Sequence, residues 1–463
     1  MSESGLNNYS DDQADAGLRI FLILATFKFT DMRWLKSTIV LLGFLCFLHS
    51  CVQNTNWNQY LGPDRNATVT GKNILRSWTA AGPKELWSFP LGEGYGGASI
   101  FDDEVFILDR KKGESDILRC LDFNSGEEKW NYSYEAIGEL PFPGSRAVPT
   151  VDDKYVWSVG PRGHFYCFDR NTHLPVWNHD LLEEFEGALS TWGVSQSPVI
   201  HKDLVIVAPQ GGKAGVAAFN KMSGQLVWKS RPLSGHNFHV SPTLANFGET
   251  DQVIIISPYD RRDSTTYHEV VAFEANSGKE LWKYDGLRSF ATITPATVID
   301  DKRLFLTDCS YNGNYDPVSI MLEITKNGAE FTVKELFLTE EAGSKIHPAV
   351  LYENHLYLNH TANLFQMTCM TLDGELMWEK DLAPGFELGA LILVNGLILS
   401  QNGKNGDIHL IEPSPEGYNE LGKASFFSSK KSQAWAPLAY SQGKLIIRDQ
   451  EKMVCIDLQN LAD

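Results

Sequence analysis

Residues 118–130, with the sequence LRCLDFNSGEEKW, decide the fold because the chain returns to this pattern several times. Alternating apolar residues predict a first strand, the Asn-Ser-Gly triplet at 124–126 supplies turn chemistry, and Trp130 ends a second strand four residues after the glycine. Glycine suits such a turn because the backbone there passes through positive φ. The stretch therefore predicts a β-hairpin that ends on a tryptophan.

The same hairpin recurs along the chain. Copies lie at 169–177, 220–228 and 274–282, and a shortened copy lies at 372–378. The strand-ending tryptophans are Trp87, Trp130, Trp177, Trp228, Trp282 and Trp378, separated by 43, 47, 51, 54 and 96 residues. The last interval is twice 48, so one unit has lost its tryptophan. Degenerate copies at 324–333 and 416–421 bring the number of strand endings to eight.

Each unit also has a front half. An apolar strand entered through a small residue or proline precedes each hairpin, and a polar turn leads from it to a second strand. Four antiparallel strands in roughly 45 to 50 residues make one propeller blade. The last unit lacks a fourth strand, whereas residues 83–87 form a fourth strand with no unit before it. We therefore predict an all-β, eight-bladed β-propeller of four-stranded antiparallel blades, with its ring closed by an N-terminal strand.

Composition and charge restrict the classes of function. The chain has 463 residues, a net charge of −18 and 43% hydrophobic residues, which suffices for one large repeat domain. An acidic surface repels phosphate backbones, so nucleic acid is not an expected partner. The sequence contains no H-E-x-x-H or C-x-x-C motif, and we expect no metal site. Cys120, Cys167 and Cys455 occupy the same position of different blades and should be buried, unpaired thiols.

The first fifty residues differ from the repeats. A short basic start at 32–36, an apolar run at 37–48 and a small-residue end predict that residues 1–51 are an export segment. Leu48-His-Ser-Cys51 resembles a bacterial lipoprotein processing box, which implies that Cys51 carries a lipid. An ordinary signal peptide or membrane anchor is the alternative, and a translation start at Met32 would account for residues 1–31. Residues 52–82 then form a lead and cap, and residues 83–463 form the propeller.

The lead and the repeats together resemble a known family. Trp57 followed by Gly62-Pro63-x-Arg65, the Ser-Pro-Val strand entries and the Asp-x-x-Ser-Gly-x-x-x-Trp turns are similar to those of the PQQ-like (quinoprotein-type) repeat propellers, over essentially the whole mature chain. The resemblance implies the fold but leaves the function open. The family contains quinone-dependent alcohol dehydrogenases and also non-catalytic lipoproteins, such as the propeller subunit of the outer-membrane β-barrel assembly machinery.

The dehydrogenase branch carries adjacent cysteines over the cofactor, a Ca²⁺ ion held by carboxylate and amide side chains, and an Asp base. This sequence has no Cys-Cys pair, and no Ca²⁺ ligand or catalytic Asp matches residue by residue. We therefore expect no catalytic residue and no cofactor, and a monomeric binding or scaffolding module of the bacterial cell envelope that meets the membrane only through its lipid. The alternative is a PQQ-dependent alcohol dehydrogenase of reduced size, with PQQ and calcium.

Residues just before each innermost strand should converge on the central funnel of the propeller. The candidate ligand pocket consists of Tyr95, Arg146, Trp192, His236, His347 and Trp435. Arginine, histidine and aromatic rings suit an anionic or planar ligand. The favoured alternative is a channel plug in which these side chains satisfy one another. If the funnel binds the small ligand, protein partners from the envelope are expected to use blade edges and loops elsewhere. The six repeat tryptophans are expected to dock on the next blade.

Overall fold

The computed structural model describes residues 56–459, apart from residues 72, 80, 234, 236–238, 263–264, 290–291, 310–316, 360–366, 381–384 and 429–432. Residues Asn54–Asp463 form one compact unit. The predicted export segment at 1–51, with Cys51, lies outside the described residues. Among the residues that are described, no helix has the length and apolar character needed to cross a bilayer.

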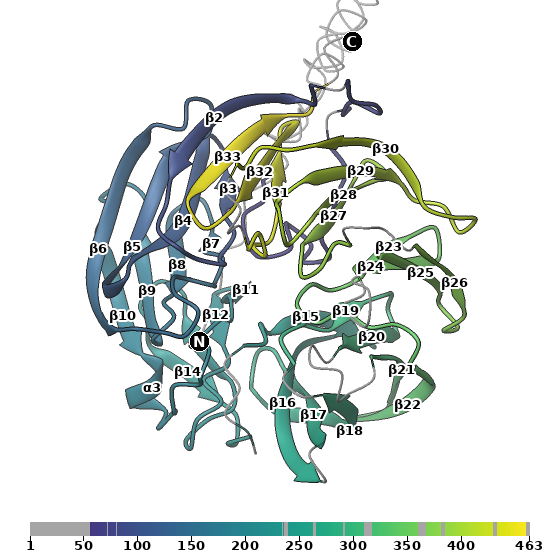
Figure 1. Cartoon of the computed structure of the whole chain (residues 1–463). Helices are drawn as coiled ribbons and strands as arrows, with labels where there is room; N and C mark the ends of the chain where they lie inside the picture. Colours follow the sequence, from purple (N-terminus) through teal and green to yellow (C-terminus); the bar gives the residue numbers. More distant parts are fainter. Residues whose placement is uncertain are drawn as a thin grey trace, which may run out of the picture. The chain divides into compact units, whose positions relative to one another are not determined.

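Eight antiparallel sheets, each of them a blade, are arranged in a ring (Figure 1). Blade 1 contains β3 (Ser99–Phe101), β4 (Glu104–Lys111), β5 (Gly113–Asp122) and β6 (Glu128–Gly138), and blade 2 contains β7 (Thr150–Val151), β8 (Tyr155–Val159), β9 (His164–Asp169) and β10 (Pro175–Asp180). Blade 3 contains β11 (Val199–His201), β12 (Leu204–Val207), β13 (Ala217–Asn220) and β14 (Leu226–Lys229), and blade 4 contains β15 (Thr243–Phe247), β16 (Thr250–Arg262), β17 (Thr265–Glu274) and β18 (Glu280–Ser289).

The second half of the ring repeats this pattern. Blade 5 contains β19 (Thr297–Val298), β20 (Arg303–Asp308), β21 (Val318–Asn327) and β22 (Glu330–Thr339), and blade 6 contains β23 (Val350–Tyr352), β24 (His355–Asn359), β25 (Met367–Thr371) and β26 (Leu376–Lys380). Blade 7 contains β27 (Leu391–Val394), β28 (Leu397–Gln401), β29 (Ile408–Glu412) and β30 (Asn419–Ala424). Blade 8 contains β31 (Ala439–Ser441), β32 (Lys444–Arg448), β33 (Lys452–Asp457) and the early strand β2 (Lys84–Pro90).

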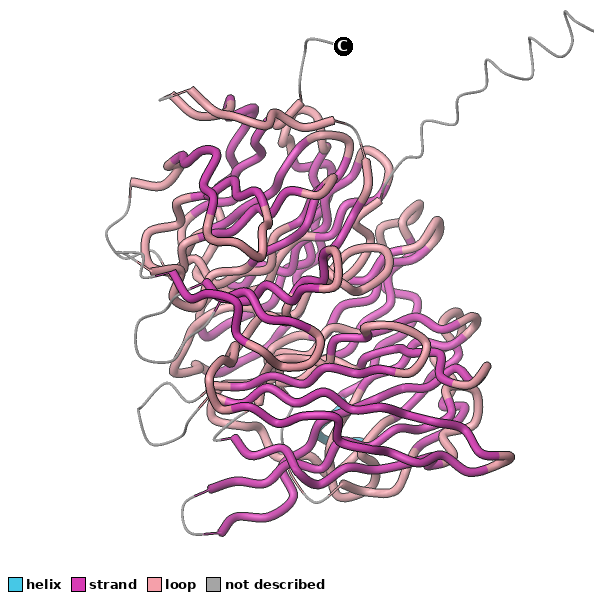
Figure 2. The backbone as a smooth tube through the Cα atoms, turned by 90° about the vertical axis from the view of Figure 1, so that its right-hand side faces the viewer, coloured by secondary structure: helices cyan, strands magenta, loops and turns pink. Residues whose placement is uncertain are grey.

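Strand β2 closes the ring, because it pairs antiparallel with β33 from Lys84↔Asp457 to Pro90↔Lys452. The prediction of an eight-bladed propeller closed by an N-terminal strand is therefore confirmed. Strands and loops make up nearly all of the described chain (Figure 2), and α3 (Leu181–Glu184) is the one helix assigned in that part. Cys120, Cys167 and Cys455 are buried and unpaired, as expected.

Tryptophans of the fourth strands dock on the hairpin of the next blade. The prediction that they end these strands is wrong, because the pairing continues past them: Trp130 is the third residue of β6, which runs on to Gly138. In three copies the indole Nε1–H donates to the carbonyl oxygen three residues before the turn glycine: Trp87 to Phe123 at 3.0 Å, Trp177 to Lys221 at 3.2 Å and Trp228 to Ala275 at 3.1 Å. A methyl group on Gly126, Gly224 or Gly278 would lie 2.5, 2.7 or 2.4 Å from that tryptophan. Each glycine has φ between 71° and 74°. Both the space and the backbone therefore require glycine here.

The other copies depart from this pattern. Trp130 stacks on His173, which stands where the other turns have glycine, with ring centroids 4.9 Å apart. Trp378 donates to the Ser414 carbonyl of the next blade at 2.8 Å. Trp282 instead donates within its own blade, to the Gln252 amide oxygen of β16 at 2.7 Å, and no atom lies within 4 Å of a methyl group on the next turn glycine, Gly328. Blade 5 ends without tryptophan, and Phe337 covers the turn glycine of blade 6 in its place. Sequence spacing did not reveal Phe337, because it lies farther from its turn: it pairs with Met321 across the hairpin, whereas Trp282 pairs with Ala272 close to the turn.

The N-terminal lead, residues 56–71, lies inside the ring. First strands of neighbouring blades contact one another, as β3 contacts β7 and β31, so these strands are innermost. The lead bonds to them: Ile100 N–H donates to the Trp57 carbonyl at 2.8 Å, Val151 N–H donates to the Asn58 carbonyl at 2.8 Å, and β1 (Thr68–Val69) pairs parallel with β27. Trp57 is only 1% exposed. The lead therefore fills the centre that a ring of blades would otherwise leave open.

The docking contact predicts an unequal effect of the same substitution at two turns. Gly278→Ala adds a methyl group at φ 71° against Trp228, whereas Gly328 has φ 67° with no atom within 4 Å of such a methyl. Strain and displacement of the indole should lower the free energy of unfolding of Gly278→Ala by about 2–4 kcal/mol, and strain alone should lower that of Gly328→Ala by about 1 kcal/mol. Urea denaturation measures both, and equal losses would contradict the docking role.

Candidate functional site

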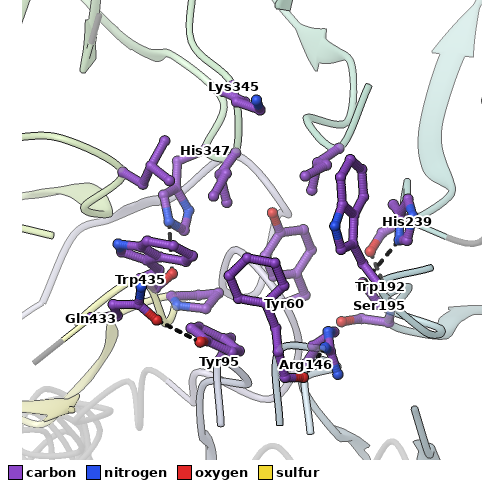
Figure 3. Close-up of a pocket in the computed structure, with 17 residues that line it drawn as sticks. Tyr60, Tyr95, Arg146, Trp192, Ser195, His239, Lys345, His347, Gln433 and Trp435 are labelled. Carbon is purple, nitrogen blue, oxygen red and sulfur yellow. Dashed lines mark hydrogen bonds between the residues drawn. The ribbon is translucent and has the colours of Figure 1, made fainter. Parts of the chain in front are cut away.

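A cavity of about 320 Å³ lies where the loops before the innermost strands meet (Figure 3). Five of the six predicted pocket residues line it together: Tyr95, Arg146, Trp192, His347 and Trp435. The sixth, His236, lies outside the described residues. The cavity also contains side chains that the sequence analysis did not select, namely Tyr60, Phe142, Ser195, His239, Lys345 and Gln433.

Some of the missed residues carried a usable signal in the sequence. His239 and Lys345 lie two residues before the Ser241-Pro and His347-Pro strand entries, so a wider window before each entry would have included them. Tyr60 carried no such signal, because it belongs to the lead and the lead has no counterpart in the repeats. Its position in the cavity depends on the lead lying inside the ring, which repeat spacing does not predict.

Aromatic side chains form one wall of the cavity. Tyr95 and Trp435 stack with ring centroids 5.2 Å apart, and Phe142 lies with its centroid 6.1 Å from each of them. The Tyr95 hydroxyl donates to the Gln433 amide oxygen at 2.7 Å. His347 Nε2–H donates to the Trp435 carbonyl at 3.0 Å, which fixes the loop that carries this indole. These bonds fix the positions of the two stacked rings.

Arg146 brings a positive charge to this wall. Its guanidinium donates to the Gly144 carbonyl at 2.7 Å and to the Phe142 carbonyl, and lies 5.9 Å from the Tyr95 ring centroid. No carboxylate of the described chain forms an ion pair with it. Burial lowers the pKa of Arg146 to about 10, so the side chain stays charged at neutral pH. Among the described residues, carbonyl dipoles and the Tyr95 ring are the groups that face this charge.

The opposite side of the cavity carries Trp192 and His239, across Tyr60 from Trp435 (Figure 3). The two rings lie 5.3 Å apart. The Ser190 hydroxyl donates to the Gly193 carbonyl at 2.9 Å and lies 3.3 Å from His239 Nε2, whose N–H it can accept. Burial, followed by the nearby charge of Arg146, lowers the pKa of His239 to about 3. The imidazole is therefore neutral at physiological pH.

Lys345 is the second cationic group of the lining. Burial lowers its pKa, and the charge of Asp308 opposes that shift. Asp308 does not line the cavity and is buried, and burial raises the pKa of its carboxyl to about 7. No aspartate or glutamate belongs to the described lining. The cavity thus combines aromatic walls with two cations and suits an anion.

The lining does not fit the calcium ion of a quinone cofactor site. Ca²⁺ takes six to eight oxygen ligands, mostly from carboxylates, carbonyls and waters. The described lining offers hydroxyls, one amide, cations and imidazoles but no carboxylate. Nor does the described part of the chain hold a group of three or more His, Cys, Asp or Glu residues suited to a metal. We derive no catalytic step through PQQ and calcium.

Fold and cavity together define an eight-bladed propeller with a cavity at its centre. The family model described as "Outer membrane protein assembly factor BamB" matches residues 114–328. This match and the propeller fold confirm the resemblance to the PQQ-like repeat propellers that was inferred from the turns.

Known proteins on both branches of this fold are similar to the chain. Quinoprotein ethanol dehydrogenase from Pseudomonas aeruginosa is 23% identical over 158 residues, which are 33% of this chain and 24% of the enzyme. The match thus spans about a quarter of that relative. BamB from Moraxella catarrhalis superposes with a TM-score of 0.55 at 16% identity, covering 83% of this chain and 99% of that one. A europium-containing methanol dehydrogenase superposes with a TM-score of 0.61 at 11% identity, covering 85% of this chain and 90% of that one. At these identities the structural likeness shows the fold alone.

The buried His347 predicts a pH dependence of stability. Burial lowers its pKa to about 4 in the folded protein, whereas a histidine in an unfolded chain titrates near pH 6.5. Between these values the unfolded chain binds more protons, so stability falls as the pH drops through this window. His347→Asn should reduce the slope of the unfolding free energy against pH by up to about 1.4 kcal/mol per pH unit. Urea denaturation of both proteins between pH 6.5 and 4.5 measures this, and parallel profiles would contradict it.

Proposed function

We propose that this chain is a non-catalytic binding propeller of the bacterial cell envelope, tethered to a membrane by a lipid on Cys51, whose central cavity takes a small planar anion. The single observation that carries the ligand class is the charge of the cavity. Arg146 and Lys345 line a space with no described carboxylate, in a chain whose net charge is −18. A cationic pocket within an acidic protein favours one sign of ligand.

The chemistry of Arg146 supports an anion at this position. Two of the five guanidinium N–H groups donate hydrogen bonds to the Gly144 and Phe142 carbonyls. No other acceptor among the described residues pairs with this guanidinium, so hydrogen-bonding capacity remains for a carboxylate or a similar group. Charge-assisted hydrogen bonds are stronger away from water than on an open surface. The stacked Tyr95 and Trp435 rings give a planar ligand a face to lie on.

The envelope location and a scaffolding role rest on similarity. The family model for outer membrane protein assembly factor BamB matches the chain, and BamB from Moraxella catarrhalis shares the fold over 99% of its own length. Blades 2 and 3 also expose large apolar side chains on their fourth strands and hairpins: Leu174, Val176, Met222, Leu226 and Val227. Exposed apolar groups of this kind suit a protein partner on the outer rim.

A quinone-dependent alcohol dehydrogenase is the second candidate, favoured by the match to quinoprotein ethanol dehydrogenase. The two candidates differ in one experiment. The protein is incubated with PQQ and Ca²⁺, freed of excess cofactor, and tested for dye reduction by alcohols. The binding propeller should retain no stoichiometric PQQ and reduce no dye. Tight uptake with alcohol-dependent dye reduction would favour the dehydrogenase.

The lipid anchor predicts a change of compartment on substitution. Cys51→Ala removes the thiol that the lipoprotein processing box presents. The variant should lose fatty-acid labelling and leave the membrane fraction, because a folded propeller has no other lipid attachment in this proposal. Metabolic labelling and fractionation measure both, with Cys120→Ala, a buried cysteine of blade 1, as the control. A labelled, membrane-bound Cys51→Ala protein would refute the anchor.

The cavity predicts selective binding of a planar carboxylate. Naphthalene-2-carboxylate should bind the wild type more tightly than its neutral amide, because Arg146 pairs with the carboxylate. Arg146→Ala combined with Trp192→Ala should weaken the carboxylate at least about tenfold, which is the loss of one charged contact. Isothermal titration calorimetry measures the affinities. The control is Arg76→Ala, which removes a surface arginine paired with Glu412. Equal binding to wild type and double variant would locate the site elsewhere.

A further inference from the structure

We infer that the N-terminal lead completes the ligand cavity, with Tyr60 at its tip forming the end wall that sets how long a ligand the cavity accepts. The inference rests on the proposed function for the ligand class but concerns a different element. The proposed site was built from blade loops, whereas Tyr60 comes from a segment outside the repeats. The lead therefore contributes a residue that determines ligand specificity.

Both ends of the lead are fixed at one face of the ring. Asp102 N–H, in the turn between β3 and β4, donates to the Asn56 amide oxygen at 2.8 Å. Asn395, in the turn between β27 and β28, accepts from Gly71 N–H at 2.8 Å and donates its own N–H to the Val69 carbonyl at 3.1 Å. These turns follow the innermost strands. The lead therefore enters and leaves the ring at the face where those strands end.

The tip of the lead lies at the other end of the innermost strands. Arg65 Nη2 donates to the Pro242 carbonyl at 2.9 Å, directly before β15. The neighbouring Ser241 lines the cavity, as does Tyr60. Figure 3 shows Tyr60 in the middle of the view, surrounded by the residues that the blades contribute. The lead is thus a loop inserted along the channel. Its tip, which carries Tyr60, closes the cavity at the end opposite its opening.

Contacts with the ring hold the tip in a conformation that its own residues disfavour. Leu61, Arg65 and Ala67 have φ of 64°, 54° and 56°, a region in which residues other than glycine are strained. Such strain persists only where the surroundings determine the backbone, and it gathers at functional sites. Trp57, buried beneath the tip, lies against Gly62, where a methyl group would come within 3.0 Å of the indole. Contacts with the ring therefore fix the backbone of the tip and hold it in place as a wall of the cavity.

The Tyr60 ring has the size and chemistry of an end wall. Tyr60 is 8% exposed, and the Arg65 guanidinium lies 6.0 Å from its ring centroid on the lead itself. Burial raises the pKa of its phenol, so the side chain is neutral at physiological pH and adds no negative charge to the cavity. Removal of the ring should lengthen the cavity toward Trp57 without changing the cationic groups. Ligand length, and not charge preference, is then the property that Tyr60 controls.

Two probes of different length test this wall. Affinities of naphthalene-2-carboxylate and anthracene-2-carboxylate are measured by calorimetry for wild type, Tyr60→Ala and Tyr60→Phe. Tyr60→Ala should shift the affinity ratio toward the longer anthracene probe by at least about tenfold, the scale of one buried aromatic ring. Tyr60→Phe keeps the ring and should keep the wild-type ratio. An unchanged ratio in Tyr60→Ala, while both probes still bind, would overturn the inference. If Tyr60→Ala fails to fold, Tyr60→Leu replaces it and is judged by the same ratio.

A second measurement needs no ligand and separates the Tyr60 wall from the proposed ligand class. Tyr60→Cys places a thiol at the wall, whereas Ala67→Cys places one on the returning arm of the same lead, where Ala67 is fully buried. In the folded full-length protein, iodoacetamide should modify Cys at position 60 at least about tenfold faster than at position 67, as peptide masses report. Equal rates would overturn the wall. If the wild type binds neither carboxylate but the rates differ as expected, the proposed ligand class fails and the wall stands.

Discussion

The docking of one aromatic ring on the turn of the next blade is the interaction on which the ring depends. A blade of four strands buries its faces only against its neighbours, so a contact that recurs from blade to blade holds the ring together. The indole of a fourth strand offers it, and the turn glycine of the next blade receives it, as Trp228 and Gly278 do. Burial of such a ring removes on the order of 200 Å² from water, worth several kcal/mol per blade.

Closure of the ring places eight blade-entry loops around one axis, and this convergence produces the cavity. Side chains as distant in sequence as Tyr95 and Trp435 stack there because β2 joins the last blade to the first. The lead occupies the rest of the channel, so the space above Tyr60 is a pocket and not a pore. Its described lining contains two cations and no carboxylate, whereas the chain as a whole has a negative net charge.

The fold could be predicted from the sequence because the repeat encodes it locally. Turn glycines and tryptophans fixed the blade count, and the unpaired strand before Trp87 predicted closure. The position just before each innermost strand located Tyr95, Arg146, Trp192, His347 and Trp435 at one cavity. Phe337 and Tyr60 escaped prediction for a common reason. Their roles depend on contacts between segments that share no repeat position, and periodicity carries no information about such contacts.

Anomalous diffraction from crystals grown with 6-bromonaphthalene-2-carboxylate would test the central claim most directly, because bromine marks the ligand without prior assumptions about its site. The account predicts one dominant bromine peak inside the ring, between the Trp435 and Trp192 sides, with the carboxylate at Arg146. Bromine peaks confined to the outer blade surfaces, with an empty centre, would contradict the claim that the cavity of this propeller is built to hold a planar anion.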